Sequence, residues 1–129
     1  MREEIRLPEL GPPISHYTEA VRFGNLLYVS GVVAMDGEGN VVAPGDAVAQ
    51  TRKIFENMKV ILNAAGCGFA DVLKVTVFLT DIADRPRINP VRQEAFGSAR
   101  PASTLVQVGA LVHPDLCVEI ECVAGIPGA

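Results

Sequence analysis

The chain has 129 residues, of which 49% are hydrophobic and 20% are charged, a composition typical of one folded domain rather than a disordered segment. Its 15 acidic residues outnumber its 11 basic ones, which argues against nucleic acid as a partner, because binding it requires a surplus of Lys and Arg. No apolar run is long enough to cross a bilayer, and no apolar stretch follows the N-terminal Met1-Arg2-Glu3-Glu4, so we expect a cytoplasmic protein that makes no membrane contact. The length predicts a single domain over residues 1–129.

The N-terminal part is expected to form an irregular arm followed by two strands. The arm ends in Glu9-Leu10-Gly11-Pro12-Pro13. Residues 17–22 and 26–30 then flank Phe23-Gly24-Asn25, a turn-rich spacer of hairpin length. A glycine-rich loop precedes the next element.

The clearest helix is predicted between Asp46 and Gly66. Asp46 can cap it by accepting from free amides of the first turn, and Gly66 can end it in the left-handed conformation. Residues at spacings of three and four give one apolar stripe that we expect to be core. The stripe consists of Val48, Thr51, Phe55, Met58, Leu62 and Ala65.

The next two elements are a strand and a shorter helix. Residues 72–79 are rich in β-branched side chains and predict a strand that is nearly buried on both faces. The second helix is expected to begin at Asn89-Pro90, with Asn89 as cap, and to run to Phe96 before Gly97.

Two further strands are predicted at residues 104–109 and 117–123. The order β-β-α-β-α-β-β then predicts an α+β fold, in which both helices cover one face of a mostly antiparallel sheet.

The cysteines and histidines do not indicate a metal or a disulfide framework. Cys67, Cys117 and Cys122 are odd in number, so reduced thiols are expected. No C-x-x-C pair occurs, and neither His16 nor His113 has a second ligand at metal spacing. We therefore expect neither a metal nor another cofactor.

The last strand carries two carboxylates on one face. Glu119 and Glu121 lie roughly 6.6 Å apart along an extended strand, where mutual repulsion or partial burial would raise the pKa of one of them. That residue would be a candidate general base. The alternative is an ordinary solvent-facing strand.

A second candidate site lies where the second helix leads into a strand. The segment Gly97-Ser98-Ala99-Arg100-Pro101-Ala102-Ser103-Thr104 presents hydroxyls and backbone amides at a sheet edge, where a small anion could bind. The alternative is a plain crossover loop with Arg100 in solvent.

Taken together, these segments resemble the RidA/YjgF family, also called the L-PSP endoribonuclease-like family, over nearly the whole chain. The segments that carry the resemblance are Leu27-Tyr28-Val29-Ser30-Gly31, Ala49-Gln50-Thr51-Arg52, Asn57-Met58-Lys59, Ala64-Ala65-Gly66, Val75-Thr76-Val77-Phe78-Leu79-Thr80-Asp81, Asn89 and Arg100-Pro101-Ala102.

The resemblance implies a chorismate-mutase-like α+β domain that assembles as a homotrimer with small-molecule clefts between subunits. It also implies hydrolysis of reactive 2-imino or enamine acids to 2-keto acids and ammonia. The expected partners are therefore further copies of the chain and a small carboxylate or imine ligand.

The resemblance also assigns site residues. Tyr17 would close the cleft, Ser30 and Gly31 match the family's Ser-Gly step, Asn89 matches its helix asparagine, and Glu121 matches the glutamate that positions water. The expected catalytic residues are Glu121, Ser103 and Asn89, and the expected substrate-binding residues are Tyr17, Ser30, Gly31, Val32, Ser103, Thr104 and Arg100.

Two of these positions depart from the family pattern. Val32 replaces the usual glutamine, and Ser103 replaces the arginine that holds the substrate carboxylate. Because each charge-assisted hydrogen bond is worth about 1.5–3 kcal/mol, the loss of two such bonds predicts an affinity lower by roughly two to four decades. The cations that could replace this arginine are Arg85, Arg87, Arg92, Arg100 and His113.

We therefore expect a deaminase-type hydrolase of an imine or enamine, with a substrate that differs from the family's usual one. The alternative is a trimer that binds a small ligand without turnover. An endoribonuclease or translation inhibitor is a third reading, and the acidic charge balance argues against it.

Overall fold

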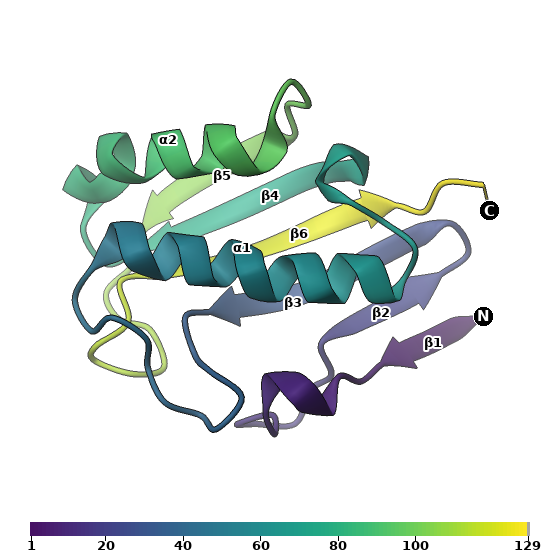
Figure 1. The fold of residues 1–129 in the computed structure, drawn as a ribbon, viewed down its shortest axis with the longest axis horizontal. Helices are drawn as coiled ribbons and strands as arrows, with labels where there is room; N and C mark the ends of the chain where they lie inside the picture. Colours follow the sequence, from purple (N-terminus) through teal and green to yellow (C-terminus); the bar gives the residue numbers. More distant parts are fainter. Residues whose placement is uncertain (129) are drawn as a thin grey trace.

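A computed structural model describes residues 1–128 as one six-stranded sheet covered on one face by two helices (Figure 1). The strands are β1 (Arg2–Ile5), β2 (Ala20–Phe23), β3 (Leu26–Val33), β4 (Val72–Leu79), β5 (Ala102–Gln107) and β6 (Val118–Gly125). The helices are α1 (Ala47–Ala64) and α2 (Arg85–Phe96), with short 3₁₀ turns η1 (Pro8–Leu10), η2 (Phe69–Asp71) and η3 (Ile82–Asp84).

The strand order β1-β2-β3-β6-β4-β5 confirms the expected α+β arrangement. Every neighbouring pair is antiparallel except β4 and β5, which are parallel and are joined through α2. Helix α1 likewise connects β3 to β4, which lie on either side of β6. Both helices therefore cross the same face and bury it (Figure 1).

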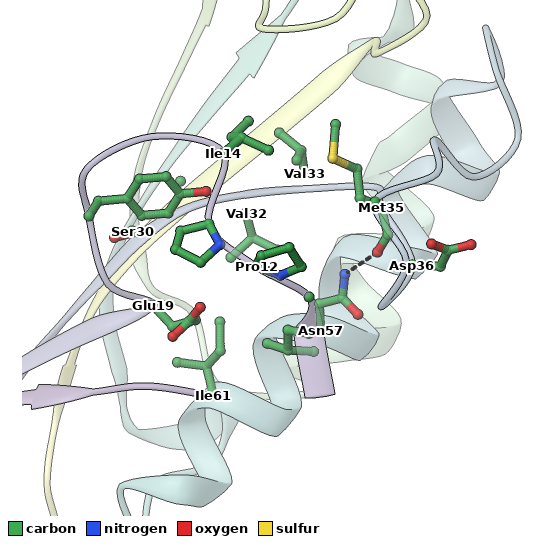
Figure 2. Close-up of a pocket in the computed structure, with 16 residues that line it drawn as sticks. Pro12, Ile14, Glu19, Ser30, Val32, Val33, Met35, Asp36, Asn57 and Ile61 are labelled. Carbon is green, nitrogen blue, oxygen red and sulfur yellow. Dashed lines mark hydrogen bonds between the residues drawn. The ribbon is translucent and has the colours of Figure 1, made fainter. Parts of the chain in front are cut away.

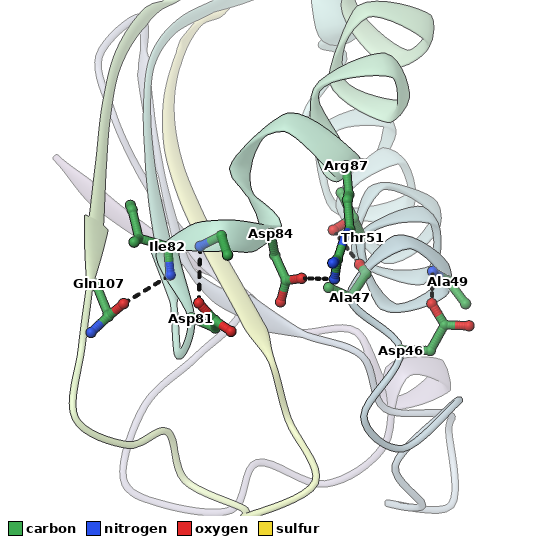
Figure 3. Close-up of polar contacts among 10 residues, drawn as sticks. Asp46, Ala47, Ala49, Thr51, Asp81, Ile82, Asp84, Arg87 and Gln107 are labelled. Carbon is green, nitrogen blue, oxygen red and sulfur yellow. Dashed lines mark hydrogen bonds and ion pairs between the residues drawn. The ribbon is translucent and has the colours of Figure 1, made fainter.

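Helix α1 begins and ends as its sequence predicts. The Asp46 carboxylate accepts a hydrogen bond from the Ala49 amide at 3.0 Å (Figure 3). At the other end Gly66 has a φ of 77°, and the Cys67 amide donates to the carbonyl of Leu62 at 2.9 Å. This is a Schellman termination, which glycine adopts without steric cost.

The buried face of α1 is wider than the predicted stripe. Thr51, Phe55, Met58 and Leu62 are buried as expected, whereas Val48 and Ala65 are only half-buried. The residues that also become buried are Ala47, Gln50, Ile54, Asn57 and Ile61. The helix lies flat over the sheet, so it buries a broader arc than a narrow stripe.

The predicted start of the second helix is wrong. Helix α2 begins at Arg85, so Asn89 is an exposed residue inside the helix and not its cap. The turn η3 leads directly into it, and Pro86 in the first turn has a φ suited to helix initiation. Pro90 removes only the hydrogen bond that residue 90 would donate to the carbonyl of Pro86, near the helix start.

The N-terminal arm is also more regular than expected. Residues Arg2–Ile5 form β1, which pairs with β2 at the edge of the sheet. Its charged sequence has no apolar alternation to predict a strand, since the pairing depends on backbone groups. The other strands differ from their predicted bounds by a few residues, and β4 has the bounds that the sequence predicts.

The expectation that β4 is buried on both faces is wrong within a single chain. Val75, Val77 and Leu79 are buried beneath the helices, whereas Thr76 and Phe78 are only half-buried. We call the helix-free side of the sheet the open face. It also exposes large apolar side chains, with Phe23 60% and Tyr28 52% accessible.

Gln50 ties α1 to the loop that precedes β6. Its side chain is completely buried, and its amide donates to the carbonyls of Ala43 at 3.0 Å and Asp115 at 2.8 Å. Its carbonyl oxygen accepts from the Cys117 amide at 2.7 Å. One side chain therefore fixes the start of the central strand relative to the helix.

We predict that Gln50→Leu lowers the free energy of unfolding by at least about 2 kcal/mol, because it leaves a backbone amide and two carbonyls without their partner. Urea unfolding followed by circular dichroism measures this. Gln93→Leu, at an exposed position of α2, is the matched control and should change stability by less than about 0.5 kcal/mol. Equal stability of the two variants would contradict the assigned role.

Candidate functional site

A cavity of about 90 Å³ lies between the N-terminal arm, β3 and α1 (Figure 2). Its walls include Tyr17, Ser30, Gly31 and Val32, so four of the predicted substrate-binding residues lie together. Pro12 and Ile14 of the arm face Ile61 of α1 and Val33 of β3 across it (Figure 2). The lining is mostly apolar.

The polar groups around this cavity are held by hydrogen bonds. The Ser30 hydroxyl donates to the Thr18 carbonyl at 2.6 Å. The half-buried Glu19 carboxylate accepts from the Leu7 amide at 2.9 Å, and the Asn57 side chain donates to the Met35 carbonyl at 3.0 Å. These contacts fix the arm against β3.

Ser30 and Gly31 form a β-bulge in β3. Val29 pairs with Cys122 and Val32 pairs with Ile120, so the two bulged residues lie opposite Glu121 alone. A bulge disrupts the ladder locally and changes the direction of its side chains.

The bulge accommodates the side chain of Glu119. A Cβ atom at Gly31 would overlap the Glu119 carboxylate and would lie 2.9 Å from its Cδ, so glycine lets this carboxylate keep its observed position. Burial raises the pKa of Glu119, and the charge of Glu121 raises it further. Glu119 thus has the raised pKa that the sequence predicts for one of the two carboxylates.

Glu121, which the family resemblance selects as the catalytic carboxylate, is exposed in the chain. It lines a separate hollow of about 300 Å³ on the open face, together with Ser30, Tyr28 and Lys74. Of the two carboxylates on β6, Glu119 is therefore the partly buried one. The sequence signal for Glu119 was present in the two-residue spacing, and it could not decide between the two.

The other predicted residues lie on β5 and around α2. Ser103 accepts a hydrogen bond from the Arg92 guanidinium at 2.7 Å, and Thr104 accepts one from the Lys74 ammonium at 2.6 Å. Asn89, in α2, and Arg100, in the loop before β5, are exposed.

The two groups of predicted residues are separated within one chain. Strands β6 and β4 lie between β3 and β5, and a spacing of about 4.8 Å per strand puts Gly31 and Ser103 roughly 14 Å apart across the sheet. A single small ligand therefore cannot contact Gly31 and Ser103 of the same chain.

The cations proposed to replace the missing arginine have different surroundings. Arg87 forms an ion pair with Asp84 at 2.9 Å (Figure 3), and the His113 Nδ1 accepts from the Asp115 amide at 3.1 Å. Arg85 and Arg100 are exposed. Within residues 1–128, Arg92 is the only one of these candidate cations that forms a hydrogen bond with Ser103.

Residues 1–128 contain no group of three or more His, Cys, Asp and Glu side chains arranged to hold a metal ion. Neither of the two α-helices in this part of the chain is both long and apolar enough to span a membrane.

Comparison with known proteins identifies the family. The family model described as Endoribonuclease L-PSP matches residues 9–126. The chain belongs to this family. This membership confirms the RidA/YjgF resemblance seen in the sequence.

One curated relative is named as a deaminase, and one solved relative holds a bound ligand. The chain is 46% identical to the 3-aminoacrylate deaminase RutC of Acinetobacter baylyi, over 98% of this chain and 100% of that protein. The crystal structure of RidA from the Antarctic bacterium Psychrobacter sp. PAMC 21119 has a TM-score of 0.89 at 34% identity, covering 96% of this chain and 99% of that one. E. coli TdcF, solved with bound serine, has a TM-score of 0.86 at 32% identity, covering 95% and 98%.

We predict that Glu119→Gln stabilises the L-PSP family protein at neutral pH. Because the pKa of Glu119 is raised on folding, the folded state binds this proton more tightly than the unfolded chain. The contribution of this proton to the free energy of unfolding is complete below the ordinary pKa of a carboxyl group. It is lost as the pH rises through the raised pKa of Glu119. Melting temperatures from pH 4 to 8 should fall less steeply for Glu119→Gln than for the unsubstituted protein. Identical pH profiles would contradict the burial of this carboxylate.

Proposed function

We propose that this protein is a deaminase that hydrolyses a small enamine or imine acid such as 3-aminoacrylate, with Glu119 as the general base. The observation that carries the proposal is the Glu119 carboxylate packed against the Gly31 bulge, with a pKa raised by burial. The 46% identity to a 3-aminoacrylate deaminase over the full length of both chains supports the reaction class.

The chemistry requires a water molecule, a base and a group that holds the substrate. In the protonated imine form of the substrate, water attacks the carbon of the C=N bond while Glu119 accepts a proton from that water, which leaves a neutral carbinolamine. Glu119 then returns this proton to the amino nitrogen, the C–N bond breaks with release of ammonia, and the hydroxyl loses its proton to leave a carbonyl acid. A carboxylate with a raised pKa is suited to both proton transfers, since it is a stronger base than an exposed one.

We propose that the groove is completed by a neighbouring copy in a homotrimer. The Gly31 and Ser103 groups lie too far apart to act together in one chain, and exposed apolar side chains of the open face offer a surface for association. In such an assembly, Gly31 and Glu119 of one subunit face Ser103 of the next. Tyr17, which is 42% exposed at the cavity, then covers the ligand.

The second candidate function is a trimer that binds a small ligand without turnover. Ser103 in place of the family's arginine favours it, because a neutral hydroxyl holds a carboxylate more weakly than a guanidinium does. The activity measurement below decides between the two functions.

We predict that Glu119→Gln lowers the rate of ammonia release from freshly generated 3-aminoacrylate by about 100-fold or more, since general-base catalysis contributes on that order. The matched variant Glu121→Gln should keep most of the activity. Because the charge of Glu121 raises the pKa of Glu119, removing it should shift the acid limb of the pH–rate profile to lower pH.

Two results would contradict this proposal. Loss of activity in Glu121→Gln with retention in Glu119→Gln would assign the base to Glu121, the residue that the family resemblance selects. No ammonia release by the unsubstituted protein above the rate in buffer would favour the binding function.

A mixing experiment tests whether each groove is shared between subunits. Glu119→Gln and Ser103→Asp alter opposite sides of the proposed groove, so each variant alone should be inactive. In co-expressed trimers about one groove in four combines two unaltered sides, so about a quarter of the activity should return. Sedimentation should show a species with three times the mass of the chain. Inactive mixtures or stable monomers would contradict the shared groove.

A further inference from the structure

Arg92 is a half-buried cation without an anionic partner in the described chain. It lies on α2, and its Nη2 donates to the Ser103 hydroxyl at 2.7 Å. No carboxylate of residues 1–128 forms an ion pair with it, whereas Arg2, Arg52 and Arg87 each have one. Burial of the Arg92 guanidinium lowers its pKa.

A partly desolvated guanidinium that contacts only a neutral hydroxyl is an incomplete arrangement. A buried charge is stabilised when it is paired, and Ser103 supplies no negative charge. Ser103 accepts the hydrogen bond, so its own proton remains free to donate. The Arg92 guanidinium and the Ser103 hydroxyl therefore both offer hydrogen-bond donors at the same place, and no anionic group accepts from them in residues 1–128.

Ser103 is accessible to solvent beside Arg92. Ser103 lies on β5, the edge strand of the sheet, and is exposed. Its directly paired neighbour on β4 is Val75, whose side chain is buried, so Ser103 is on the helix side. Asn89 lies three residues before Arg92 on α2, which puts both side chains on one face of the helix.

We propose that Arg92 and Ser103 form a two-residue clamp for the carboxylate of the substrate, with the guanidinium supplied by α2 instead of by β5. This inference rests on the proposed deaminase function and defines its substrate as an anion. The serine bound to the related TdcF also carries a carboxylate. Position 103 then retains a donor, and the positive charge reaches it from a helix.

Lys74 provides a useful contrast. Its ammonium donates to Thr104, the next residue of β5, whose side chain points to the open face. The two cations therefore lie on opposite faces of the same edge strand. Of these two cations, Arg92 is the one on the face of β5 that carries Ser103, so the clamp is assigned to Arg92.

The kinetic test compares Arg92→Gln and Arg92→Lys with the unsubstituted protein, using ammonia release from 3-aminoacrylate. We expect KM to rise by about 10- to 100-fold in Arg92→Gln, with a smaller change in kcat, because a charge-assisted pair is lost. Arg92→Lys keeps the charge and loses the planar fork, so its KM should be intermediate. Arg52→Gln, an exposed arginine on α1, is the matched control and should leave KM unchanged.

A rescue variant distinguishes carboxylate binding from a structural role of Arg92. Adding Ser103→Arg to Arg92→Gln returns a guanidinium to the same place from β5, and this should lower KM toward its original value. If Arg92 had only a structural role, Ser103→Arg would not restore KM in the Arg92→Gln variant. Melting temperatures of all variants show whether each one is folded.

Binding measurements separate this inference from the proposed reaction. Calorimetry with L-serine and with L-serinamide, which lacks the carboxylate, should show a preference for serine that disappears in Arg92→Gln. If this preference is seen without ammonia release, the clamp stands and the deaminase function fails. An unchanged KM in Arg92→Gln, or no preference for serine in the unsubstituted protein, would overturn the clamp.

Discussion

The close approach of the Glu119 carboxylate to Gly31 is the contact on which the candidate site depends. Strand β6 lies between β3 and β4, so its two faces have different environments. Val118, Ile120 and Cys122 are buried beneath the helices, and Glu119 and Glu121 point to the open face. The bulge at Ser30 and Gly31 creates space for one of these two carboxylates, and burial in that space raises its pKa.

The packing of the chain explains why one subunit holds only part of the site. Helices α1 and α2 bury most of one face of the sheet, and the open face remains without a cover. The cavity at β3 and the donors at β5 then lie on either side of the central strands β6 and β4. A groove between subunits is the arrangement in which both groups can reach a single small molecule, and this is the basis of the proposed trimer.

The sequence predicted the fold class well because its strongest signals are local. The capping carboxylate of Asp46, the glycine at position 66 and the β-branched run of β4 each act through neighbouring residues. The failures have equally physical causes. Strand β1 depends on backbone pairing with β2, and the start of α2 depends on the preceding turn and Pro86 rather than on Asn89.

The sequence alone determined the family, the two helices over one sheet face, and the pair of carboxylates on the last strand. These depend on motif order and on the alternation of side chains along a strand, both of which can be read from the chain itself. Only the tertiary structure decided that Glu119 is the carboxylate packed against Gly31 and that Arg92 meets Ser103. Each of these contacts joins two different elements, and a strand bulge or the placement of a helix over the sheet sets it, so spacing along the chain could not predict it.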